Sequence, residues 1–314
     1  MLLRSLRPVE WLLLFLVLIT SPLFFIGGPD WLSPPLYRAC WNLGHIAFFA
    51  VSLHLVCRLW PVRSWLAALL WLLLVFVGGM LIEWLQTKVG REASWLDVGN
   101  NLLGAGLGLF WSMTARPWVW LARAALTMLL AWPLISVARI ALVQWESAQQ
   151  FPLLAGFEQE RELIRWDGLV ERVEQAATQG NYALQMTFGT QRYSGVSLNW
   201  FLGDWRGYKA LSFDVFNPHD DNLPLMIRIH DLAHDLGDMA YDDRFNRRLV
   251  IAPGANRIRI DLAEVQKAPE SRQMALHQLR AIGFFTVQLP QPRQIYLDNL
   301  RLEVADENPQ QTSP

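Results

Sequence analysis

The first 150 residues contain apolar runs that are long enough for membrane-spanning helices. A helix needs about 20 mostly apolar residues to cross a bilayer. Five segments come close to this length or exceed it, and they are residues 9–26, 41–59, 64–84, 97–113 and 118–143. The sequence therefore predicts a polytopic α-helical membrane bundle with about five transmembrane helices over residues 1–150.

The hydropathy pattern of the chain changes at Phe151, where alternation of apolar and polar residues replaces the long apolar runs. Alternation with a period of two is typical of strands with one buried face. Seven segments show it, and they are residues 183–188, 210–216, 223–230, 247–251, 256–262, 283–289 and 294–304. We predict an all-β jelly-roll sandwich over residues 151–306, with a short helix or long loop at 263–279 and a disordered tail at 307–314.

The charge of the chain is split between its two parts. Residues 1–150 carry a net charge of +4 and residues 151–314 a net charge of −5. Neither part is basic enough to indicate nucleic acid as a partner. No phosphate-binding glycine loop, Gly-x-Ser-x-Gly, His-Glu-x-x-His or cysteine pair occurs, so no cofactor is expected and no metal site is assigned.

Positive residues in short loops predict the orientation of the helices. With the N-terminus inside, the inner loops hold five of them, Arg4, Arg7, Arg58, Arg63 and Arg116, and the outer loops hold three, Arg38, Lys88 and Arg91. An excess on the inner side favours a cytoplasmic N-terminus. Five spans then place the second domain outside. The first apolar segment lacks a small-residue cleavage site, so we expect an uncleaved anchor.

A polar stretch, residues 83–101, interrupts the apolar part of the chain. Glu83 and Gln86 share one helix face, and Asp97 and Asn101 share another. An ionisable side chain at or within a bilayer usually has an ion-pair or hydrogen-bond partner or a functional role. Arg91 is a natural partner for Glu83 or Asp97. Alternatively, Ser94 and Asp97 form a helix-capping box, and Glu83 and Arg91 form a purely structural pair.

The polar stretch resembles the signature of the VanZ-like family of small membrane proteins, over roughly residues 5–145. The matching residues are Glu83, Gln86, Arg91, Ser94, Asp97, Asn101, Gly104 and Gly108, with His45 on an earlier helix. The family often has a lysine three residues before this histidine, where this chain has Asn42. The resemblance implies a role in the cell envelope, in the context of glycopeptide-antibiotic tolerance, and supplies no mechanism.

Residues 157–304 resemble galactose-binding-type jelly rolls, including non-catalytic carbohydrate-binding modules. The segments that carry this resemblance are residues 204–218, 225–231, 241–248, 253–262 and 296–302. The resemblance implies a fold, and it implies a glycan or a protein as possible ligand.

Candidate glycan contacts are aromatic residues and the polar segment 230–248. They are Trp200, Trp205, His230, Asp231, Tyr241 and Asp242. Sugars stack their apolar faces on exposed aromatic rings, whereas Trp205 also fits a core position. The acidic residues of the segment match no EF-hand spacing, and a loop of hydrated aspartates explains them equally well.

These features lead to three hypotheses for a bacterial inner-membrane protein with an extracytoplasmic second domain. In the first, the polar cluster of the bundle binds the headgroup of an envelope lipid or lipid-linked glycan, and the sandwich binds glycan. In the second, Glu83, Asp97 and His45 catalyse a reaction on a lipid-linked precursor. In the third, the cluster is structural and the sandwich binds another protein. Membrane lipids and glycans are the expected partners, and the oligomeric state stays open.

Overall fold

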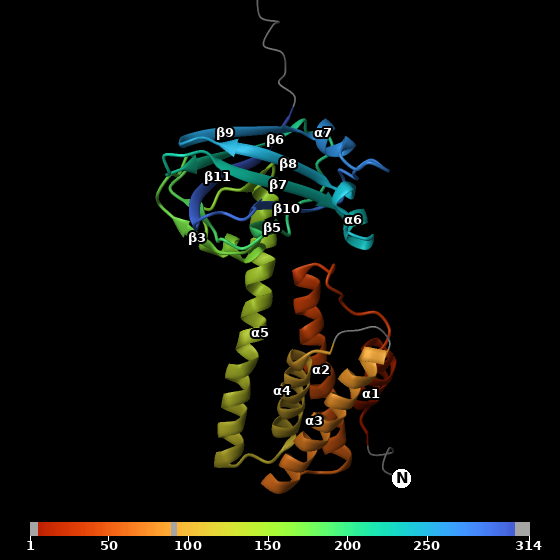
Figure 1. The fold of residues 1–314 in the computed structure, drawn as a ribbon. Coiled ribbons are helices and arrows are strands. Elements are labelled where there is room, and N and C mark those ends of the chain that lie inside the picture. The colour runs from red at the N-terminus through yellow and green to blue at the C-terminus, as the bar shows by residue number, and fades with distance from the viewer. Residues whose placement is uncertain (1–5, 89–92, 305–314) are drawn as a thin grey trace, which may run out of the picture. The chain divides into compact units, whose positions relative to one another are not determined.

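The computed structural model describes residues 6–88 and 93–304, and the chain divides into two compact units between Ala141 and Leu142. The first unit is helical (Figure 1). Its helices are α1 (Pro8–Thr20), α2 (Pro35–Leu59), α3 (Trp65–Lys88), α4 (Trp95–Ser112) and α5 (Pro117–Gln150), with the short 3-10 helix η2 (Ser21–Phe24) after α1; α5 continues into the second unit. Proline opens α1, α2 and α5, where its missing N–H costs no helical hydrogen bond.

Three of these helices, α2, α3 and α5, are long and apolar enough to cross a membrane. The number of helices that meet this criterion is therefore three, where the sequence predicts about five transmembrane helices. The helix α1 is shorter, and α4 carries Asp97, Asn100 and Asn101 in its first two turns.

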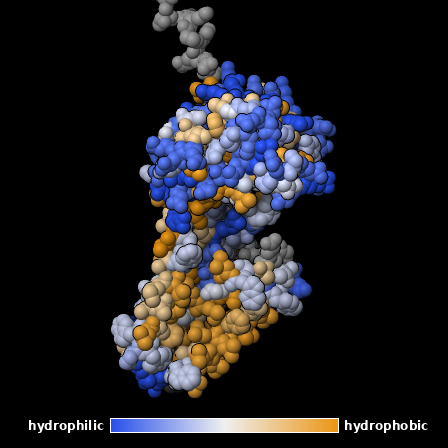
Figure 2. All heavy atoms as spheres, turned by 60° about the vertical axis from the view of Figure 1, so that its left-hand side comes forward, coloured by the Kyte–Doolittle hydropathy of each residue, from blue (hydrophilic) through white to orange (hydrophobic). Residues whose placement is uncertain are grey.

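Large apolar side chains cover the outside of the helical unit (Figure 2). Trp132 on α5 is 76% exposed, and Leu66 on α3 is 60% exposed. Water solvates such a surface poorly, whereas lipid tails contact it without penalty. The helices are therefore compatible with insertion into a membrane.

The second unit is a sandwich of two antiparallel sheets. The first sheet has the order β3 (Val170–Val173), β4 (Ala183–Phe188), β11 (Arg293–Glu303), β6 (Ala210–Asn217) and β9 (Gly254–Asp261), and β1 (Leu153–Ala155) also pairs with β11. The second sheet has the order β2 (Trp166–Asp167), β5 (Ser194–Asn199), β10 (Leu279–Thr286), β7 (Leu223–Asp231) and β8 (Phe245–Ile251). The short helices are η3 (Glu160–Arg165), α6 (Leu232–Leu236), η4 (Tyr241–Asp243) and α7 (Leu262–Lys267).

Alternate residues of each strand face the core between the sheets. On β7, Leu225, Ile227 and Ile229 are fully buried, whereas Met226 and Arg228 between them are half-buried on the opposite face. This is the period of two that the sequence shows, so the predicted β-sandwich is confirmed.

All seven predicted strands are present, as β4 and β6 to β11, and the prediction missed β1, β2, β3 and β5. The strand β5 reads SGVSLN and has only two core residues, Val196 and Leu198. The segment 263–279 contains the end of α7 and reaches β10, which begins at Leu279. The predicted tail at 307–314 lies outside the described residues.

Candidate functional site

The polar residues Glu83, Gln86, Asp97, Asn100 and Asn101 of the helical unit are buried. Glu83 accepts a hydrogen bond from the Ser94 backbone N–H at 2.7 Å. Ser94 is the N-cap of α4, and its hydroxyl accepts from the Asp97 N–H at 3.3 Å. The Gln86 amide donates to the Phe24 carbonyl at 2.7 Å. The capping role predicted for Ser94 therefore has a geometric basis, and Gln86 ties α3 to η2.

His45 brings α2 into this cluster. Its Nδ1 lies 2.9 Å from Oδ1 of Asn101, and its Nε2 lies 4.0 Å from Oδ2 of Asp97. Asn101 is fully buried, and His45 is 3% exposed. The structure therefore joins His45, Asp97 and Asn101 from α2 and α4, while the Glu83 carboxylate lies against the start of α4. Arg91 lies outside the described residues.

Gly104 and Gly108 allow α2 and α4 to approach closely. A Cβ on Gly104 would lie 2.2 Å from the Ile46 carbonyl oxygen, and a Cβ on Gly108 would lie 2.0 Å from that of Ala50. Both distances are shorter than atoms tolerate, so only glycine fits. The two glycines are packing residues, as small residues on membrane helices usually are.

An apolar cavity of about 470 Å³ lies between α1, η2 and α2. Its walls are mainly leucine, valine and aromatic side chains, including Leu16, Phe24 and Phe48, and His45 also lines it. The imidazole that contacts Asp97 and Asn101 is therefore also a wall of an apolar cavity.

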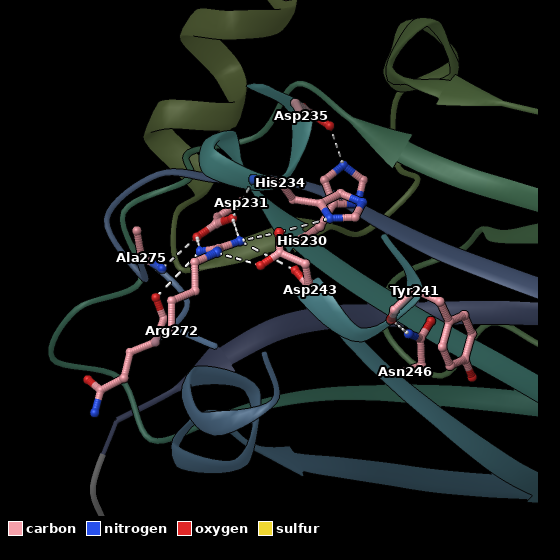
Figure 3. A network of polar contacts seen from close by, with 10 residues as sticks. His230, Asp231, His234, Asp235, Tyr241, Asp243, Asn246, Arg272 and Ala275 are labelled. Atoms are coloured by element: carbon pink, nitrogen blue, oxygen red, sulfur yellow. Dashed lines mark hydrogen bonds and ion pairs between the residues drawn. The ribbon is translucent and has the colours of Figure 1, made fainter. Parts of the chain in front are cut away.

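In the sandwich, an ion-pair network fixes the segments around α6 (Figure 3). Arg272 donates to both oxygens of Asp231 at 2.7 and 2.8 Å and to both oxygens of Asp243 at 2.6 and 2.8 Å. Asp231 is fully buried at the end of β7. Burial acts to raise the pKa of Asp231. The hydrogen bonds from Arg272 and from the backbone N–H groups of Ala275 and His234, together with the charge of Arg272, outweigh it and hold that pKa below its ordinary value. Asp231 is thus a buried anchor and presents no surface to a glycan.

Two histidines lie beside this network. His230 Nε2 is 3.1 Å from Asp235 Oδ1, and His234 Nδ1 is 3.3 Å from Asp243 Oδ2. Burial, followed by the charge of Arg228, lowers the pKa of His230 to about 3. Burial raises the pKa of Asp235, against the opposing effect of Arg280. His230 is consequently neutral at physiological pH, and its ring is nearly buried.

The aromatic candidates differ in exposure. Trp205 is fully buried in the sandwich core, and its indole N–H donates to the Leu202 carbonyl at 3.0 Å. It therefore fits the core alternative rather than a sugar-stacking role. Trp200 lies half-buried with the Arg280 guanidinium 5.0 Å from its ring centre. Tyr241 is 63% exposed, and Asp242 beside it is also exposed.

A hollow of about 380 Å³, here called the sheet hollow, lies on the outer face of the second sheet. It is lined by Tyr193, Gly195, Ser197, Arg228, Tyr241, Arg244, Gly283, Phe284 and Phe285. The strand register aligns Ser197, Gly283 and Arg228 across β5, β10 and β7. These residues alternate with the buried Val196, Ile282 and Ile227, which places the hollow on the face opposite the core.

Of the sequence candidates, only Tyr241 lines the sheet hollow. The sequence analysis missed Tyr193, Arg228, Arg244 and Phe285, which come from segments far apart in the chain. One signal was available: Arg228 is a charged residue at an outward position of a strongly alternating strand.

A second hollow, of about 420 Å³, adjoins the first along β8 and is lined in part by Asp242, Glu264 and Glu270. Tyr241 and Arg244 line both hollows. Within residues 6–88 and 93–304, no group of three or more His, Cys, Asp or Glu side chains is arranged to hold a metal ion.

Comparison with protein-family models gives no match to this chain, and comparison with curated proteins gives none at a significant level. Solved structures similar to the sandwich include carbohydrate-binding modules. A family 11 module from Clostridium thermocellum, in complex with a β-1,3-1,4-mixed-linked tetrasaccharide, is 15% identical with a TM-score of 0.39, over 49% of this chain and 95% of that one. A family 28 module specific for non-crystalline cellulose is 12% identical with a TM-score of 0.35, over 49% of this chain and 95% of that one.

Proposed function

We propose that this chain is a membrane-anchored glycan-binding protein whose sandwich binds a saccharide in the sheet hollow. The observation that carries the proposal is the combination of exposed aromatic rings and polar groups in one concavity. Its volume of about 380 Å³ falls within the range of roughly 300–1,000 Å³ that is typical of small-molecule sites.

The aromatic rings supply a stacking surface for sugar rings. Tyr193 and Phe285 lie edge to face with their ring centres 6.4 Å apart, and Tyr241 is on another segment of the rim. A pyranose exposes C–H bonds on its faces and hydroxyls around its edge. Tyrosine rings bury those faces at low conformational cost, while Ser197 and Arg228 offer hydrogen-bonding groups on the floor.

The helical unit supplies the membrane anchor. We assign it to a bacterial inner membrane with the N-terminus in the cytoplasm and the sandwich outside, on the excess of arginine in the predicted inner loops. An anchored module keeps envelope glycan near the membrane surface, which raises its effective concentration there.

A titration of full-length protein in mild detergent with a panel of oligosaccharides tests this function. Tyr241→Ala and Tyr193→Ala are expected to weaken binding about tenfold each, because each removes a stacking surface. Tyr296→Ala on the other sheet is the matched control, and it is expected to bind as the wild type does. Equal binding by all four proteins would place the site elsewhere.

A second candidate function, lipid binding by the helical unit, is favoured by the apolar cavity beside His45. The cavity fits an acyl chain by its chemistry, and the cluster of His45, Asp97 and Asn101 adjoins it. A headgroup with phosphate or amide groups is the corresponding partner of this cluster, and Arg91 is the residue best suited to phosphate.

Native mass spectrometry of the full-length protein tests the lipid site. Wild type is expected to retain a discrete lipid, and His45→Ala and Arg91→Ala are expected to lose it. His54→Ala, which changes another histidine of α2 that lies outside the cavity lining, is the control. If all four proteins retain the same lipids in the same amounts, the cluster is structural.

A further inference from the structure

The sheet hollow contains two arginines that have no acidic partner within it. No carboxylate lies within 4.0 Å of the guanidinium of Arg228 or Arg244 among the described residues, although ion pairs are frequent elsewhere in the sandwich. The Nε atoms of both arginines are buried and make no hydrogen bond to described residues. Among the described residues, the one side-chain hydrogen bond of Arg228 is a long one, 3.5 Å from Nη2 to the Ser197 hydroxyl.

The nearby acidic and aromatic groups do not neutralise these charges. Asp235 is already ion-paired with Arg280, at 3.5 Å, and it also lies 3.1 Å from the neutral His230 ring. The Arg244 guanidinium lies 5.4 Å from the centre of the Tyr241 ring, and both residues line the hollow. The acidic side chains Asp242, Glu264 and Glu270 line the second hollow and not this one.

The two positive charges act on each other and on their surroundings. Burial, followed by the charge of Arg244, lowers the pKa of Arg228 from its ordinary value. The same two arginines contribute to the low pKa of His230. A half-buried cation without a counter-ion is costly, so an anion that enters the hollow is bound with more free energy than a neutral group.

The floor of the hollow is shaped around Arg228. A Cβ on Gly283 would lie 3.0 Å from Arg228 Nε and 3.4 Å from its Nη2. Glycine at this position therefore lets the Arg228 guanidinium lie close to the backbone of β10. A guanidinium fork matches the paired oxygens of carboxylate, sulfate or phosphate.

We infer that the sheet hollow selects an anionic saccharide, whose acidic group is held by Arg228 and Arg244 while Tyr193, Tyr241 and Phe285 contact the sugar rings. This inference rests on the proposed glycan-binding function and narrows it to acidic glycans. The acidic group is a carboxylate, a sulfate ester or a phosphate diester, which share the oxygen geometry that the arginines recognise.

The test compares matched acidic and neutral polymers on the full-length protein in detergent, by calorimetric titration. The acidic probes are oligogalacturonate, a sulfated galactan and a glycerol-phosphate polymer that carries sugar. The neutral probes are the carboxyl-reduced oligogalacturonate, the desulfated galactan and the free sugar of the third probe. At least one acidic probe is expected to bind tenfold or more tighter than its neutral partner, and the probe that does so identifies the acidic group.

Arg228→Ala and Arg244→Ala are expected to remove most of this tenfold preference, and Arg228→Lys to remove part of it, because an ammonium lacks the fork. An increase in salt concentration from 50 to 300 mM is expected to weaken binding of the acidic probe and to leave binding of the neutral probe unchanged. Arg257→Ala, which removes an exposed arginine of the other sheet, is the control and is expected to keep the preference. Thermal unfolding verifies that each variant is folded. If Arg228→Ala does not fold, Arg244→Ala alone tests the loss of the preference.

Two results overturn the inference and separate it from the proposed function. In the first, neutral and acidic probes bind with equal affinity and the tyrosine variants weaken both. The hollow is then a glycan site, but it does not select anionic glycans. Binding of no probe, or binding that Tyr193→Ala and Tyr241→Ala leave unchanged, removes the glycan site and the selectivity together.

Discussion

Arg272 is the residue on which the loops around α6 depend. It forms paired hydrogen bonds with the fully buried Asp231 and with Asp243. Asp231 also accepts from the backbone N–H groups of Ala275, at 2.7 Å, and His234, at 3.1 Å. One guanidinium therefore links the end of β7 and the end of η4 to the loop before β10.

Removal of this guanidinium is expected to destabilise the sandwich strongly. Arg272→Ala leaves Asp231 as a buried charge without its main partner, a change that costs about 3–5 kcal/mol of unfolding free energy. Arg272→Lys is expected to lose less unfolding free energy, because a lysine still supplies the positive charge, although it cannot form the paired hydrogen bonds. Denaturant unfolding measures both. The loss in Arg272→Ala should shrink in an Asp231→Asn background, and an unchanged loss would mean that the ion pair is not its cause.

His230 is expected to make the sandwich sensitive to acid. Its pKa falls from 6.5 in the unfolded chain to about 3 in the fold, so the unfolded state binds the proton first as the pH falls. Stability is therefore lost progressively between about pH 6.5 and pH 3, by up to ~1.4 kcal/mol per pH unit. Unfolding of wild type and His230→Gln across this range measures the effect.

The His230→Gln variant is expected to show a shallower loss of stability with falling pH, because glutamine does not titrate. His277→Gln, at an exposed position of the same unit, is the control and should follow the wild-type curve. Parallel curves for wild type and His230→Gln would assign the acid sensitivity to other groups.

At the scale of elements, the contact between α2 and α4 depends on small residues. Gly104→Ala and Gly108→Ala each force a Cβ against a backbone carbonyl of α2 at 2.2 and 2.0 Å, so the helices must separate. We expect each variant to lower the midpoint of thermal unfolding of the helical unit by several degrees in detergent. Gly99→Ala on the same helix is the control, because its Cβ meets nothing within 4 Å. Equal midpoints for all three variants would show that the helices are free to separate.

The helices and strands that the sequence predicts are those with a long apolar run or a long alternation of apolar and polar residues. The β7 sequence LPLMIRIH alternates over its whole length, and each of the five apolar segments overlaps one α-helix of the structure. The strand β5 escapes prediction because Ser194, Gly195 and Ser197 have weak strand preferences. Its position is fixed instead by pairing with β10.

The same missing strand explains why the sheet hollow could not be predicted. Ser197, Arg228 and Gly283 are far apart in sequence, and only the strand register aligns them. By contrast, the predicted candidates His230 and Asp231 are neighbours in the chain, at the end of β7, and Asp231 caps the short helix α6. The ion pair of Asp231 depends on Arg272, a residue from a distant loop.

At the scale of the whole molecule, Glu10 connects two positive segments that the sequence places on the inner side of the membrane. Its carboxylate accepts from the Arg7 side chain at 2.8 Å and from Arg58 at 2.7 Å, and it is 1% exposed. The start of α1 and the end of α2 therefore lie at the same end of the helical unit. That this end of the unit faces the cytoplasm stays a prediction.

The number of membrane crossings decides whether the sandwich lies opposite the N-terminus. Five crossings, by all five helices, place the two on opposite sides, whereas four crossings place them on the same side. We expect opposite sides. The test uses single cysteines, Ser5→Cys and Asp220→Cys, in a background where Cys40 and Cys57 are replaced by serine. An impermeant maleimide applied to spheroplasts should label Asp220→Cys directly and Ser5→Cys only after lysis. Labelling of both cysteines in intact spheroplasts, or of neither, would mean an even number of crossings. Labelling of Ser5→Cys alone in intact spheroplasts would place the sheet hollow in the cytoplasm.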